Sequence, residues 1–126
     1  MKLLLDTHIL LWWLNDDEKL SENARQLIKN SDNDIYVSHV SLWEIQIKVM
    51  TGKLNVDLAA IIQQLSENNF QQLPSHTNHI LILAKLPPHH QDPFDRMLVS
   101  QALSEPLHLI THDKFVSRYS ESIILV

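Results

Sequence analysis

The first residues of the chain constrain its fold more than any other stretch. The run Leu3-Leu4-Leu5 is wholly apolar and ends in the carboxylate of Asp6, and an apolar-periodic segment follows from Ile9 to Leu14. A short apolar strand that passes directly into a helix is typical of a buried parallel sheet. Asp6 is therefore expected at the carboxyl end of a strand, which is the edge where open α/β sheets bind ligands.

Strand-like and helical patterns alternate along the rest of the sequence. Strands are expected at 35–38, 70–73, 107–110 and 123–126. Helices are expected at 9–14, 21–30, 41–50, 57–65, 77–86 and 93–103, with Ser41 as one N-cap and Gly52 as a C′ residue. This alternation predicts an α/β fold with three layers, α/β/α, around a mostly parallel central sheet.

Length and composition restrict the class of protein. A chain of 126 residues with 44% hydrophobic content fits a single domain, residues 1–126, with its own core. The net charge of −5 argues against a protein that coats nucleic acid electrostatically, but not against a nuclease whose acids are covered by metal ions. The absence of cysteine excludes disulfides and thiolate zinc sites, and a single glycine excludes Gly-rich phosphate loops.

No secretory signal is evident, and no apolar run approaches the ~20 residues of a membrane span. We therefore expect a soluble cytoplasmic protein with no membrane association.

A set of acids is expected at the same edge of the sheet, because each follows a predicted strand or opens a predicted helix. These acids are Asp6, Glu44, Asp95 and Asp113. Each also has a local explanation. The segments 41–44 and 92–95 have the form of capping boxes, and the other two acids fit N-cap or turn positions.

A shared site is the more informative interpretation, because clustered carboxylates repel one another and cost stability unless a cation neutralises them. Mg²⁺ or Mn²⁺ takes oxygen ligands and keeps open positions for a phosphate and a water. The residue types therefore favour metal-assisted phosphodiester hydrolysis. Asp6 is the first choice of ligand, and Glu44 or Asp113 is a candidate to accept the proton of the attacking water.

Several other side chains allow two interpretations of their function. The histidines show no spacing typical of a metal site, although His8 and His112 flank the acids. Arg96 fits either a phosphate contact or an ion pair. Trp12, Trp13 and Trp43 fit either the core or an interface with another protein.

The motifs Leu5-Asp6-Thr7-His8, Ser41-Leu42-Trp43-Glu44-Ile45, Asp92-Pro93-Phe94-Asp95-Arg96 and Thr111-His112-Asp113 resemble the PIN-domain family. They look most like its branch of bacterial toxin ribonucleases of the VapC type. The order and spacing match over essentially the whole chain. No single motif is specific for this family, whereas the four motifs in this order are.

The resemblance implies functions for residues that the patterns alone leave open. Asp6, Glu44 and Asp95 take the places of metal-binding acids and Asp113 that of a fourth, more loosely held one, with Mg²⁺ or Mn²⁺ as cofactor. Thr111 takes the place of a hydroxyl residue that orients the site. The family further implies endonucleolytic cleavage of RNA, a homodimer, and silencing by a cognate antitoxin in a type II toxin–antitoxin pair.

Two other classes of function compete with this one. The first is a non-catalytic PIN-like module that binds RNA or protein, which the presence of all four acids disfavours. The second is a Mg-dependent phosphoryl-transfer or receiver-type domain. A receiver needs a lysine after its late strand, where this chain has Asp113. A haloacid-dehalogenase pattern needs a second aspartate two residues after the first, where this chain has His8.

Overall fold

A five-stranded, entirely parallel sheet forms the centre of the molecule, in a computed structural model that describes all 126 residues. The strands are β1 (Lys2–Leu5), β2 (Asp34–Ser38), β3 (Gln71–Leu73), β4 (His108–Thr111) and β5 (Ile124–Leu125). Their order is β3-β2-β1-β4-β5, so the chain first builds outward from β1 on one side and then on the other. The strand order thus reverses between β1 and β4, the position at which such sheets open a crevice for ligands.

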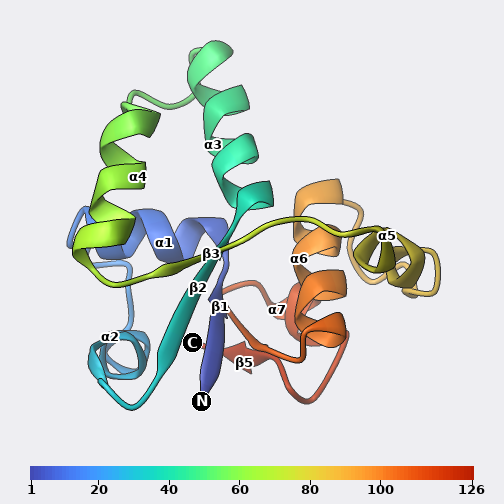
Figure 1. Cartoon of the computed structure of the whole chain (residues 1–126). Helices are drawn as coiled ribbons and strands as arrows, with labels where there is room; N and C mark the ends of the chain where they lie inside the picture. Colours follow the sequence, from blue (N-terminus) through green and yellow to red (C-terminus); the bar gives the residue numbers. More distant parts are fainter.

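Helices cover both faces of this sheet, which gives the predicted three layers (Figure 1). They are α1 (Thr7–Leu14), α2 (Glu22–Lys29), α3 (His39–Met50), α4 (Leu58–Glu67), α5 (Thr77–Leu83), α6 (Pro93–Ser104) and α7 (Lys114–Ser117). The core on one face is built with α1, α2 and α4, and the core on the other with α6 and α7. In Figure 1, α5 lies outside α6, and α3 and α4 extend together beyond the end of the sheet.

The apolar run in β1 is continuous because both of its faces are buried. Leu3 and Leu5 belong to the core with α1 and α2, and Leu4 belongs to the core with α6. All three side chains are fully buried. This alternation between two cores explains why the strand lacks the polar residues of a sheet with one wet face.

One predicted helix start is wrong. α3 begins at His39, because the Oγ of Ser38 accepts a hydrogen bond from the N–H of Val40 at 2.9 Å. Ser41, the predicted cap, is buried within the first turn and its Oγ accepts from the Oγ1 of Thr7 at 2.9 Å. β2 passes into α3 without a loop, so the helix starts earlier than the Ser41 pattern indicates. The predicted helix end is confirmed, since Gly52 follows the C-cap with φ of 75°.

Three further differences concern α1, α5 and α7. α1 begins at Thr7, before the predicted start at residue 9, because Asp6 caps it. α5 ends at Leu83, before the predicted end at residue 86, and the short helix α7 was not expected. None of the helices combines the length and apolarity that spanning a bilayer requires.

Candidate active site

Asp6 lies where the strand order reverses. Its backbone N–H donates to the carbonyl of Ile110 at 3.0 Å, which ties the end of β1 to β4. One carboxylate oxygen caps α1 by accepting from the N–H of His8 at 2.9 Å, and the other accepts from the Oγ1 of Thr111 at 2.8 Å. Asp6 is only 4% exposed. Its carboxylate is therefore fixed in orientation at the predicted edge of the sheet.

Glu44 lies in α3 beyond the first turn and is 5% exposed. Its Oε2 forms an ion pair with the Nζ of Lys48 at 3.0 Å. Its Oε1 is buried and has no hydrogen-bond partner, the one such side-chain atom in the protein. A capping function is excluded because Ser38, not Ser41, caps this helix. A buried carboxylate oxygen without a donor is costly, so this atom is available to a cation.

Asp95 occupies the third position of α6, after Asp92 as N-cap and Pro93 as first residue. The Oδ1 of Asp92 accepts from the N–H groups of Phe94 and Asp95 at 2.9 and 3.1 Å. The reciprocal bond of a capping box is missing, because the N–H of Asp92 donates to the Nδ1 of His90 at 2.9 Å. The carboxyl group of Asp95 is thus free to face the other acids.

Asp113 follows β4 and caps α7, with its Oδ1 accepting from the N–H of Phe115 at 2.8 Å. Its other oxygen lies 3.1 Å from the Nε2 of His90, and the same nitrogen lies 3.4 Å from the Oδ2 of Asp95. Ligand atoms of His90, Asp95 and Asp113 all lie within 4.8 Å of one another. The loop before α6 therefore brings a histidine into the acid cluster.

A cleft of about 300 Å³ opens onto this cluster. Its lining residues are Asp6, His8, Trp12, Asp95, His112 and Asp113. Three of the four predicted acids line it directly, and Glu44 adjoins it from inside the protein, where its charge acts on both Asp6 and Asp95. The structure thus brings all four predicted acids together.

The shared location changes how these acids ionise. Burial, opposed by the hydrogen bonds from His8 and Thr111, raises the pKa of Asp6 above its ordinary value. Burial, followed by the charges of the neighbouring acids, raises the pKa of Asp95 to about 8. Burial also acts on Asp113, but the donors from Phe115, Val116 and His90 outweigh it and lower the pKa of that carboxyl.

The residues fit a hard divalent cation better than any other ligand class. The cluster offers carboxylate oxygens, one of which is buried without a partner, and these are the atoms that Mg²⁺ and Mn²⁺ prefer. Burial first, and then the charges of the neighbouring acids, raise the pKa of Asp95, so a bound cation would offset an unfavourable negative charge there.

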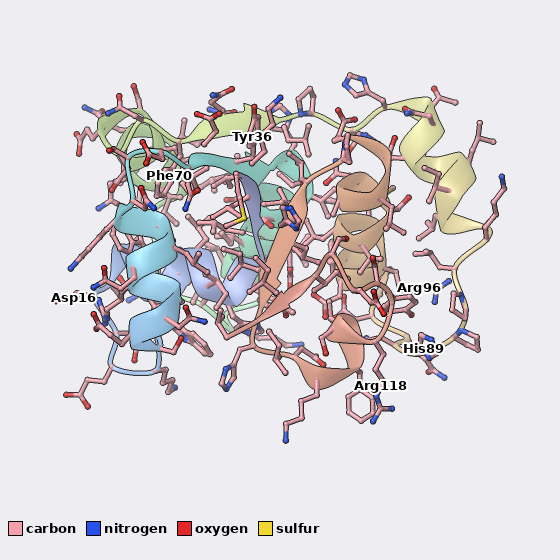
Figure 2. The ribbon with its side chains drawn as sticks, turned by 90° about the horizontal axis from the view of Figure 1, so that it is seen from below. Asp16, Tyr36, Phe70, His89, Arg96 and Arg118 are labelled. Carbon is pink, nitrogen blue, oxygen red and sulfur yellow. The ribbon has the colours of Figure 1, made fainter.

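Sequence patterns missed His90, because the contact depends on how the loop folds. The guanidinium of Arg96 does not form the predicted ion pair. It donates to the carbonyls of Pro87 and His90 at 3.1 and 3.2 Å, and to the Oη of Tyr119 at 3.0 Å. Figure 2 shows Arg96 beside the loop that carries His89. Arg96 thus holds this loop against α6.

Fold and site together define a PIN-type domain, and a family comparison agrees. A profile of the PIN domain matches residues 3–121, so the chain belongs to the PIN domain family. Among curated proteins, it is similar to Ribonuclease VapC22 of Mycobacterium tuberculosis. The two are 27% identical over 115 residues, which cover 88% of this chain and 86% of that protein.

Solved structures share the same fold. VapBC2 of Rickettsia felis bound to a promoter DNA fragment matches with a TM-score of 0.73 and 22% identity, over 100% of this chain and 98% of that chain. VapBC-5 of Mycobacterium tuberculosis, a member of the VapBC family of toxin–antitoxin systems, matches with a TM-score of 0.66 and 19% identity, over 99% and 98%. At these identities the structures establish the fold alone.

Proposed function

We propose that this protein is a metal-dependent endoribonuclease and the toxin of a type II toxin–antitoxin pair. The observation that carries the proposal is the convergence of Asp6, Asp95 and Asp113 on one cleft, with the unpartnered oxygen of Glu44 beside it. The similarity to Ribonuclease VapC22 supports RNA as the substrate. Similarity to VapBC complexes supports an antitoxin as partner.

In this proposal Asp6, Glu44, Asp95 and Asp113 hold Mg²⁺ or Mn²⁺. When bound, such an ion supplies an acidified water and stabilises charge on the phosphate that is cleaved. Thr111 and the N–H of His8 fix the carboxylate of Asp6, so the ligand set is oriented before any ion arrives.

Aromatic rings at the mouth of the cleft support a single-stranded RNA substrate. The rings of His8 and Trp12 lie 6.0 Å apart, and those of Trp12 and His112 lie 5.5 Å apart. All three side chains line the cleft beside the acids. Unpaired bases stack on such rings, so a base next to the scissile phosphate would have a surface to contact.

The test is cleavage of single-stranded RNA by the purified protein with Mg²⁺ or Mn²⁺, and in excess chelator. We expect cleavage only with metal, and loss of cleavage in Asp6→Asn and Asp95→Asn with the circular dichroism spectrum unchanged. Asp34→Asn, an exposed acid at the start of β2, is the matched control and should remain active. Full activity in chelator would falsify the proposal.

The competing classes predict different outcomes, one in the cleavage assay and one in a phosphorylation assay. A non-catalytic module would bind RNA without cutting it under any metal condition. A receiver-type domain would gain the mass of a phosphoryl group on incubation with acetyl phosphate, measured on the intact protein. Neither result is expected here, since Asp113 stands after β4 where a receiver needs its lysine, and all four acids are present.

A further inference from the structure

The backbone of His90 is fixed from two sides. Its N–H donates to the Oη of Tyr119 at 2.9 Å, and its carbonyl accepts from that hydroxyl and from the Nη1 of Arg96, each at 3.2 Å. The Tyr119 hydroxyl donates once and accepts twice, from His90 and from Arg96, so its hydrogen-bonding capacity is fully used. His90 is therefore held in place by side chains from α6 and from the segment after α7.

The tautomer of the His90 ring follows from its contacts. A backbone N–H only donates, so the Nδ1 that faces the N–H of Asp92 at 2.9 Å has to be the acceptor. In the neutral ring the proton then lies on Nε2, the nitrogen that faces Asp113 at 3.1 Å and Asp95 at 3.4 Å. The ring thus presents an N–H donor to two carboxylates.

This tautomer conflicts with metal ligation. A ligating nitrogen needs a free lone pair, so coordination through Nε2 would move the proton to Nδ1. Two N–H groups would then face each other at Nδ1 and Asp92, and the cap of α6 would lose a hydrogen bond. The short distances from His90 to Asp95 and Asp113 therefore indicate an N–H donor that faces these acids and not a shared metal-ligand set.

We propose that His90 is a positioning residue: its Nε2–H donates to Asp113 and lies 3.4 Å from Asp95, so that it orients this carboxylate pair. It does not ligate the cation, whose protein ligands are oxygens only. The inference rests on the proposed metal site and names what orients two of its acids. Hydrogen-bond partners of metal ligands typically contribute 10–100-fold to affinity when they orient the ligand.

The direct test is the imidazole ¹⁵N spectrum of the whole protein, labelled with ¹⁵N, without metal and at saturating Mg²⁺. We expect the Nε2–H tautomer of His90 in both spectra. A ring protonated on Nδ1, in either spectrum, would overturn the inference. If Mg²⁺ leaves the amide signals of Asp6 and Asp95 unchanged, the proposed function fails, and the metal-free spectrum still decides the tautomer.

Binding measurements with Mg²⁺ and Ni²⁺ provide a second test. Imidazole ligation favours Ni²⁺, whereas an oriented carboxylate pair serves both ions. We expect His90→Ala to weaken the binding of both ions by the same factor, about 10–100-fold. His90→Gln, which keeps an amide N–H donor, should restore most of the affinity. A loss much larger for Ni²⁺ than for Mg²⁺ would contradict the inference.

The matched control is the neighbouring histidine of the same loop. His89 is exposed, its ring packs on that of Tyr119 at 5.0 Å, and it is not part of the group that His90 forms with Asp95 and Asp113. His89→Ala therefore removes an imidazole from the loop without removing the donor, and it should bind both ions like the unmodified protein. A comparable loss in His89→Ala would mean that the loop as a whole, and not the His90 donor, sets the affinity.

Discussion

Asp95 lies in surroundings that disfavour its ionised form. Burial and the charges of Asp6, Asp92, Glu44 and Asp113 raise its pKa to about 8, against an ordinary value of 3.8. Between these two pH values the folded protein holds a proton that the unfolded chain releases. The stability contributed by this group is complete below pH 3.8 and is lost as the pH rises towards 8.

Asp95→Asn removes the ionisable group and keeps its shape. We expect this variant to raise the free energy of unfolding at pH 8, in chelator, by about 2–4 kcal/mol, with a much smaller gain near pH 4.5. Urea denaturation at the two pH values measures the difference. Asp32→Asn, an exposed acid in a turn, should change stability little at either pH. An equal gain at both pH values would rule out ionisation as the cause.

Thr111 orients Asp6 without belonging to the acid cluster. Its Oγ1 donates to Asp6 and accepts the N–H of Asp113 at 3.1 Å, so a single hydroxyl connects two of the acids. We expect Thr111→Val to lower Mg²⁺ affinity by about 10–100-fold, while Thr111→Ser, which keeps the hydroxyl, loses much less. Isothermal titration calorimetry measures both. Equal affinities for the Val and Ser variants would show that the hydroxyl is dispensable.

At the scale of elements, the N-terminus of α6 both stabilises the helix and positions residues of the candidate site. Asp92 caps the helix with two hydrogen bonds and also fixes the ring of His90 through its N–H. Asp57 caps α4 by accepting from the N–H of Ala59 at 3.1 Å and does not line the acid cleft. These two caps therefore separate the effect of capping from the effect on the site.

We expect Asp92→Ala and Asp57→Ala each to lower the free energy of unfolding by about 0.5–2 kcal/mol, the usual value for a lost N-cap. Only Asp92→Ala should also reduce RNA cleavage, because only its helix start carries Asp95. Chemical denaturation and a cleavage assay on both variants measure the two effects. Equal loss of cleavage in the two variants would assign the effect to general stability.

Patterns within single elements predict most of this fold but not the contacts between its loops. The apolar run of β1 predicts a buried parallel strand because hydrophobic periodicity is local, and the capped start of α6 is local as well. The choice between Ser38 and Ser41 as cap is not local, since it depends on Thr7 packing against Ser41. The contact of His90 with the acids is likewise tertiary.

At the scale of the whole molecule, sheet topology gathers the acids. β1 and β4 are adjacent although about a hundred residues separate them, so Asp6 and Thr111 meet through hydrogen bonds at the reversal of strand order. α3 and α6, which carry Glu44 and Asp95, contact each other beside this edge. The four acids therefore depend on the complete fold for their proximity.

An apolar hollow of about 500 Å³ lies apart from the acid cleft, between α3, α5 and α6. Its lining includes Val40, Trp43, Leu83, Phe94 and Met97. Trp43 is 62% exposed and its ring meets that of Phe94 at 5.2 Å. An exposed tryptophan over an apolar hollow is typical of an interface anchor, and a symmetric dimer would bury this surface from both copies at once.

We expect the protein to form a homodimer through this surface and Trp43→Glu to convert it to a monomer, because a charge at the anchor cannot be buried unpaired. Light scattering after size exclusion should give twice 14.6 kDa for the unmodified chain and 14.6 kDa for the variant. Met50→Glu is the matched control, since Met50 is 75% exposed at the far end of the same helix and should leave the dimer intact. A dimer that persists in Trp43→Glu would direct the search to the exposed apolar residues of α5, Ile80 and Leu81.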